Sequence, residues 1–191
     1  MPILGIMASQ ISGHLGPAYP YLAYDSIQTV TVSGSSTFSI SFTSIPSTYT
    51  HLQIRGIGAV NRTAAFTGGT AWTFNGDTAA NYSSHNLYGY NSVASTGSSV
   101  SISSMGLADV GTINASVQYW SPTVIDILDY ANTNKYKTAR AFTGMDNGTA
   151  TGEIDFYSAN WRSTSAITTI TMTVSTFNLL AGTTYALYGI K

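Results

Sequence analysis

The amino-acid sequence predicts an all-β protein: a jelly-roll-like antiparallel β-sandwich that carries an extended N-terminal arm. Three observations support this fold class. Apolar and polar residues alternate in many short segments, turn residues separate these segments at a spacing of roughly 8 to 12 residues, and no long segment shows the helical period. A length of 191 residues fits two stacked sheets in one domain.

The first strands are expected within residues 26–32 and 37–42, where apolar residues alternate with Thr and Ser. The short linker SGSS between them predicts a hairpin. Similar alternation predicts strands within residues 50–57, 168–174 and 183–191, and a hairpin of residues 136–144 with 152–160. Residues 122–130 could form a strand covered on both faces or a helical turn, and their β-branched content favours the strand.

Two connections can also be predicted. Asn75-Gly76 is a strong signal for a type I′ hairpin turn, because both residues tolerate positive φ. The region from Gly89 to Gly111 is low in complexity, and we expect it to form a long loop between the two sheets.

The N-terminal segment differs from the rest of the chain, so we divide the sequence into an arm, residues 1–24, and a sandwich domain, residues 25–191. The arm has no Lys or Arg, which argues against a signal peptide. Its glycines and prolines disfavour a regular element, so its apolar side chains are expected to anchor a partner protein. These are Ile3, Leu4, Ile6, Met7, Ile11 and Leu15. The alternative is that residues 3–12 form the first strand or a short helix of the sandwich.

The composition excludes several classes of function. Only 8% of the residues are charged and the net charge is -1, so the chain lacks the basic surface of a nucleic-acid-binding protein. No apolar run is long enough for membrane insertion, and the absence of cysteine excludes disulfides and thiolate metal sites. A weakly charged surface suits a homo-oligomer, a larger assembly or a neutral partner such as a glycan.

Few residues suit catalysis. Glu153 and Asp155 could form a glycosidase pair, since residues two apart on a strand share a face, but exposed carboxylates on the solvent face of a hairpin explain them better. The histidines show no metal-binding spacing and no nucleophile elbow is present. We therefore expect no catalytic residues, no metal site and no cofactor.

Aromatic residues offer a second kind of site. Trp72 and Trp120 are expected in the sandwich core rather than on a glycan-binding face. A tyrosine-rich segment is the best candidate for an exposed recognition loop, and its alternative is an ordinary strand or a contact between subunits. Its candidate residues are Tyr82, His85, Asn86, Tyr88 and Tyr90.

Several blocks of the sequence, in order, carry a resemblance over nearly the whole chain: ILGIMASQISGHL, SIPSTYTHLQIRG, FNGDTAANYSSH, IDILDYANTNKYKTAR, SANWRSTSAITTI and YALYGIK. The chain resembles a family of small structural proteins of tailed bacteriophages and related aquatic, cyanophage-like viruses. The resemblance implies a non-enzymatic virion protein, assembled in the host cytoplasm. We expect a capsid decoration or cement protein that docks on other virion proteins and forms a homo-oligomer, a trimer. The alternative is a short tail fibre or a receptor- or glycan-binding module of the tail.

Overall fold

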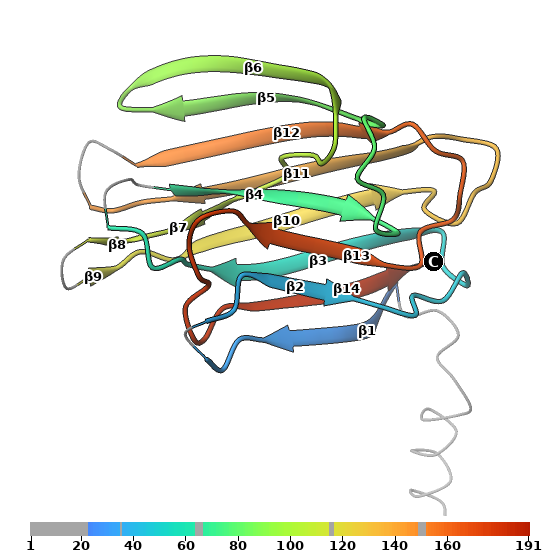
Figure 1. Ribbon diagram of the computed structural model, residues 1–191, viewed down its shortest axis with the longest axis horizontal. Helices are drawn as coiled ribbons and strands as arrows, with labels where there is room; N and C mark the ends of the chain where they lie inside the picture. The colour runs from blue at the N-terminus through green and yellow to red at the C-terminus, as the bar shows by residue number, and fades with distance from the viewer. Residues whose placement is uncertain (1–22, 35, 64–66, 115–116, 149–151) are drawn as a thin grey trace, which may run out of the picture.

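The computed structural model describes residues 23–34, 36–63, 67–114, 117–148 and 152–191, and all their regular elements are β-strands (Figure 1). The strands are β1 Tyr24–Thr31, β2 Ser39–Phe42, β3 His51–Gly58, β4 Thr67–Phe74, β5 Tyr82–Tyr90, β6 Val93–Ile102, β7 Asp109–Gly111, β8 Ile113–Asn114, β9 Val117–Gln118, β10 Ser121–Leu128, β11 Lys137–Met145, β12 Glu153–Trp161, β13 Ile170–Val174 and β14 Thr184–Ile190.

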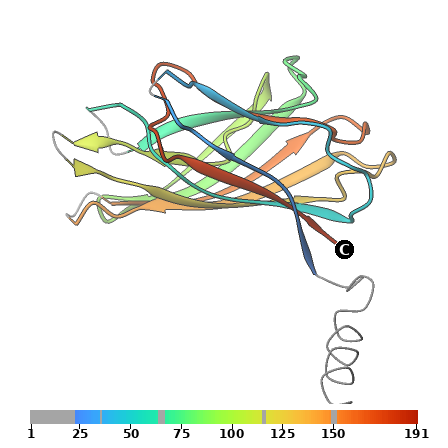
Figure 2. The ribbon, with the colours of Figure 1, turned by 90° about the horizontal axis from the view of Figure 1, so that it is seen from below.

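Two antiparallel sheets face each other, which confirms the predicted jelly-roll-like sandwich (Figure 2). The large sheet has eight strands in the order β1-β14-β3-β10-β11-β12-β5-β6, and the small sheet has four in the order β2-β13-β4-β7. Strands β8 and β9 form a separate two-stranded ribbon. The small sheet covers the middle of the large one, whereas the β5–β6 hairpin extends beyond it (Figure 1).

The core fills the space between the sheets. Strands β10 and β14 of the large sheet and β13 of the small sheet alternate buried residues with more exposed ones, as expected for strands with one face on a core. Trp72 of β4 is completely buried and packs edge-on against Tyr185 of β14, with ring centroids 6.1 Å apart. The expectation for Trp72 is therefore confirmed, whereas Trp120 is only half-buried.

The predicted strand at residues 122–130 is confirmed, because β10 covers Ser121–Leu128 between β3 and β11. The predicted hairpin of residues 26–32 with 37–42 is wrong. Strand β1 pairs with β14 in the large sheet, whereas β2 pairs with β13 in the small one. The linker between them passes from one sheet to the other.

The expected long loop from Gly89 to Gly111 is also wrong. The central part of this region is strand β6, which pairs with β5 with one irregularity in register between Tyr82 and Ser83, and the region ends in β7. A tight turn at Asn91 and Ser92 joins the two strands, and both residues have positive φ, 50° and 63°.

Asn75 and Gly76 do form a tight turn, with φ of 53° and 67° and a hydrogen bond from the backbone N–H of Asp77 to the carbonyl of Phe74. This turn does not close a hairpin, because β4 and β5 belong to different sheets.

The expected anchors of the N-terminal arm, Ile3, Leu4, Ile6, Met7, Ile11 and Leu15, lie outside the described residues. Within the described part of the chain, no helix is long and apolar enough to cross a lipid bilayer.

Candidate functional site

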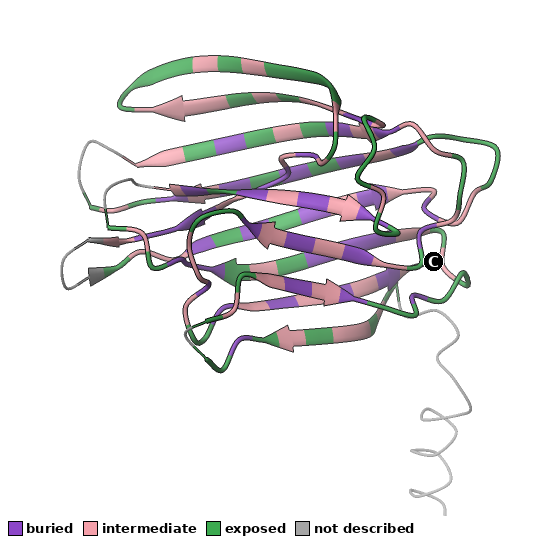
Figure 3. Ribbon diagram, in the orientation of Figure 1, coloured by how far each residue is buried: buried purple, intermediate pink, exposed green. Residues whose placement is uncertain are grey.

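The outer face of the large sheet is unusually apolar. Figure 3 shows exposed and buried residues alternating along its central strands. Exposed side chains on such a face are normally polar. Here the outward positions of four adjacent strands include Val124 of β10, Phe142 of β11, Phe156 of β12 and Leu87 of β5, which are 38%, 44%, 55% and 51% exposed.

Strand register joins these residues into one row. Val124 is paired with Phe142, Phe142 with Phe156, and Phe156 with Leu87. Directly opposite residues in antiparallel strands share a face, so the four side chains are neighbours. The rings of Phe142 and Phe156 have centroids 4.7 Å apart.

A second row lies beside the first, one pair of positions further along the strands. It contains Ile57, Pro122 and Ile154, and the last of these is paired with Gly144 on one side and Gly89 on the other. We call the two rows together the outer band: Ile57, Leu87, Pro122, Val124, Phe142, Ile154 and Phe156.

Because Gly144 and Gly89 have no side chains, the outer band is hollowed. A groove of about 700 Å³ runs over Pro122, Val124, Phe142 and Ile154, and its lining includes both glycines. Exposed apolar patches of this kind mark interaction surfaces in soluble proteins.

Charged residues border the outer band, and Arg55, Asp146 and Glu153 line its groove together with the apolar residues. Arg55 stacks over Tyr24 and Tyr188, with its guanidinium carbon 5.1 and 5.8 Å from the ring centroids. Its Nε donates to Gln53, whose Nε2 donates in turn to Asp126 Oδ1 at 2.7 Å. Arg55 is paired with Val124, so this network continues directly from the first apolar row.

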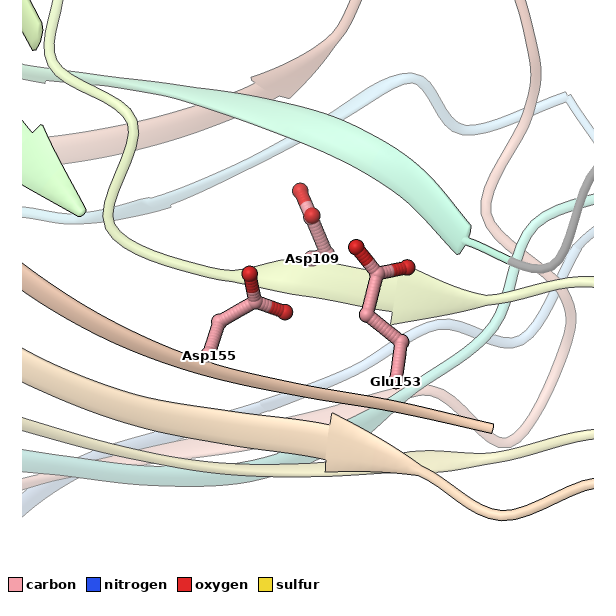
Figure 4. A group of neighbouring side chains, drawn as sticks. All are labelled: Asp109, Glu153 and Asp155. Atoms are coloured by element: carbon pink, nitrogen blue, oxygen red, sulfur yellow. The ribbon is translucent and has the colours of Figure 1, made fainter. Parts of the chain in front are cut away.

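The inner face holds the second notable group, the acidic trio of Asp109, Glu153 and Asp155 (Figure 4). Asp109 begins β7 of the small sheet, and the other two lie on β12 of the large sheet. One carboxylate oxygen from each residue lies within 4.8 Å of those of the others. The trio therefore brings carboxylates from both sheets close together.

The prediction that Glu153 and Asp155 share a face is confirmed, but the predicted solvent face is wrong. Asp155 is only 1% exposed and Glu153 is half-buried. Ile154 and Phe156 occupy the outward positions instead. Glu153 Oε2 accepts a hydrogen bond of 2.7 Å from the Thr67 hydroxyl. In contrast, Asp155 Oδ2 is buried and has no hydrogen-bond partner within the described parts of the chain.

This environment shifts the pKa values of the trio and of a neighbouring tyrosine. Burial, reinforced by the charges of Asp109 and Glu153, raises the pKa of Asp155 to about 7. Burial and the charge of Glu153 raise the pKa of Asp109 to about 6, although a hydrogen bond from Tyr157 opposes the shift. Burial and the charges of the same carboxylates raise the pKa of Tyr157.

The predicted recognition loop is wrong as a loop, because Tyr82, His85, Asn86, Tyr88 and Tyr90 all lie on strand β5, the named alternative. Tyr82 is completely buried, and its hydroxyl accepts from the backbone N–H of Phe74 at 3.0 Å. His85 is exposed and, with Asn86, lines a shallow depression that also includes Arg140 and Phe156. The five residues thus do not form one surface.

Sequence reasoning missed the outer band and Asp109. Residues 152–160 alternate as a strand does, but the alternation does not tell whether the odd-numbered or the even-numbered residues face the core. Asp109 belongs to the small sheet and is distant in sequence from Glu153, so no local spacing connects them.

Comparison of the chain with protein-family models, with curated proteins and with solved structures found no match in any of the three.

Proposed function

We propose that this protein is a non-enzymatic structural protein that assembles in several copies, with the outer band as the contact between copies. The observation that carries the proposal is the outer band itself: two adjacent rows of exposed apolar side chains across the centre of the large sheet. Burial of such a surface is the main favourable term in protein association.

A second copy of the chain fits this surface for electrostatic reasons. The net charge is -1 and only 8% of residues are charged, so two copies repel each other weakly. The seven residues of the outer band are uncharged. Among the charged residues that line its groove, Arg55 stacks over Tyr24 and Tyr188 and donates to Gln53, and Glu153 accepts from Thr67, so both keep partners within the chain when the surface is covered.

The resemblance to structural proteins of tailed phages supplies the biological setting of the proposal. In a virion, the job that fits a non-enzymatic sandwich is capsid decoration: the domain would bury surface between capsid subunits, and the arm of residues 1–24 would dock on them. The proposed homo-oligomer is a trimer.

The arrangement of the acidic residues supports a role other than glycoside hydrolysis. A glycosidase needs two carboxyl groups on opposite sides of an accessible sugar bond. Asp155 is 1% exposed and shares the space between the sheets with Asp109, where a sugar chain cannot reach it.

The oligomeric state tests the outer band. We expect the wild-type chain to sediment as an oligomer, and the double variant Phe142→Ser, Phe156→Ser to sediment as a folded monomer. The matched control is Val93→Ser, Val100→Ser, which removes side chains that are 60% and 67% exposed on edge strand β6, outside the outer band. A monomeric wild type, or equal dissociation of both variants, would refute this interface.

Incorporation into particles tests the virion role. A chain that lacks residues 1–20 should keep the sandwich but no longer join phage heads, and heads without the protein should lose resistance to heat. Intact, heat-resistant heads would contradict a decoration role.

A tail fibre or glycan-binding module is the second candidate, and the depression beside His85, Asn86 and Arg140 favours it. In that case particles without the protein should adsorb poorly to host cells, and the isolated chain should bind a glycan array. His85→Ala should abolish that binding. Absence of binding to glycans and to host cells would exclude this candidate.

A further inference from the structure

The acidic trio has two features of a ligand-binding site: its carboxylates lie close together, and one buried carboxylate oxygen has no hydrogen-bond partner within the described residues. One oxygen each from Asp109, Glu153 and Asp155 lies within 4.8 Å of the others, and Figure 4 shows the three carboxylates directed toward a common space. Asp155 is only 1% exposed, and its Oδ2 has no hydrogen-bond partner among the residues that the structure describes. A buried carboxylate oxygen without a partner carries a large desolvation cost.

No basic side chain neutralises this group within the described residues. The ion pairs there involve Asp25 and Asp129, and none involves the trio. The only hydrogen bonds found for the trio's carboxylates in these residues come from hydroxyl groups, Thr67 to Glu153 and Tyr157 to Asp109. The three charges therefore lack a counter-charge.

We propose that Asp109, Glu153 and Asp155 form a binding site for a divalent cation of the calcium type. Calcium takes oxygen ligands at 2.3–2.6 Å, so ligand oxygens on opposite sides of one ion lie up to about 5 Å apart. The spacing within the trio fits that limit. Magnesium needs ligands at about 2.0–2.1 Å, so oxygens on opposite sides of it lie only about 4 Å apart, which is a shorter span than the 4.8 Å limit that contains the trio.

The type of ligand also selects the cation. The group contains only carboxylates, and hard oxygen ligands suit calcium, magnesium or manganese rather than zinc or copper. Asp109 and Glu153 are partly exposed, so water can reach the site from one side and supply the remaining ligands. Asp155 provides the buried end.

The position of the site gives the cation a structural role. Asp109 belongs to β7 and the other two ligands belong to β12, so a bound ion links the small sheet to the large sheet. A ligand that binds only the folded state stabilises it. This inference is independent of the outer band, which lies on the opposite face of β12.

Calorimetric titration of the chelator-treated full chain with CaCl₂ at pH 8, together with thermal melting, tests the site. We expect wild type to bind about one ion and to melt at a higher temperature with calcium. Asp155→Asn and Glu153→Gln should each weaken binding about tenfold or more and remove most of the melting shift. The matched control Asp25→Asn removes a carboxylate that pairs with Lys191, and it should behave as wild type.

Two results would overturn the proposal. One is that neither calcium nor magnesium nor manganese produces binding heat or a melting shift with the wild-type chain. The other is that calcium binds equally well to wild type and to both trio variants, which would place the ion elsewhere. Glu153 is half-buried, so its variant provides a folded readout even if Asp155→Asn were to unfold the chain.

Discussion

The buried carboxylate of Asp155 predicts an unusual pH dependence of stability. In chelating buffer, its pKa is raised from 3.8 to about 7 in the folded protein. The folded state therefore holds a proton that the unfolded chain has already released, and the stability of the wild type falls as pH rises from about 4 to about 7. The substitution Asp155→Asn removes this titration, so the variant should lose less stability over the same range.

The size of the effect follows from the shift. Between pH 5 and pH 8 the wild type crosses about 2 pH units in which only the unfolded chain is ionised, which corresponds to about 3 kcal/mol. The amide of the variant carries its own burial cost, about 1–3 kcal/mol, but that cost is the same at both pH values. For a chain of this size, 3 kcal/mol changes the melting temperature by roughly 6–12 °C.

Thermal melting followed by circular dichroism, at pH 5 and pH 8 with chelator, measures the difference. The Tm of the variant minus the Tm of wild type should be roughly 6–12 °C larger at pH 8 than at pH 5. The groups that face Asp155 are Asp109, Glu153 and Tyr157, and the first of these contributes a smaller effect of the same sign. Parallel pH profiles for the two proteins would refute the reasoning.

Two further predictions concern stability, and both use chemical denaturation as the assay. Lys137 is completely buried and its Nζ donates to three backbone carbonyls, so Lys137→Met should lower the free energy of unfolding by about 3 kcal/mol or more. The control Lys135→Met breaks an exposed ion pair with Asp129 and should lower it by less than about 1 kcal/mol. Equal losses would show that the carbonyls need no cation. In Gly56→Ala the new Cβ would lie 2.1 Å from the Tyr185 ring, at a cost of about 1–3 kcal/mol, whereas Gly34→Ala meets nothing within 4 Å and should change stability by less than about 0.5 kcal/mol. A neutral Gly56→Ala would mean that the ring can move aside.

Local alternation was enough to predict the fold class and most strands, because most strands have one face on the core. It could not assign strands to sheets. Residues 26–32 and 37–42 look like a hairpin, yet their partners are β14 and β13, near the other end of the chain. Pairing over such a separation depends on the total packing of the two sheets, and a local pattern contains no information about that.

The two candidate sites could not be predicted because β12 buries the face that its sequence pattern predicts to be exposed. Its sequence alternates Glu153, Ile154, Asp155 and Phe156, and hydrophobic burial favours the two apolar residues on the inside. The structure has the opposite arrangement, with Asp155 inside and Phe156 outside. The same inversion places Ile154 and Phe156 in the outer band and Glu153 and Asp155 in the acidic trio, so one wrong assumption about which face of β12 is buried concealed the contribution of this strand to both sites.

The β5–β6 hairpin reaches past the edge of the small sheet, and every residue of β6 is exposed or only half-buried. Strand β6 is also the last strand of the large sheet, so it pairs with one neighbour, β5, and its other contacts are at its end, where Ser101 accepts from Arg162 and Ile102 packs against the core. Amide protons in this hairpin should therefore exchange with solvent through local opening, long before those of β3 and β10 at the centre. Local stability is therefore highest at the centre of the large sheet and lowest at its β5–β6 edge, where opening costs little free energy.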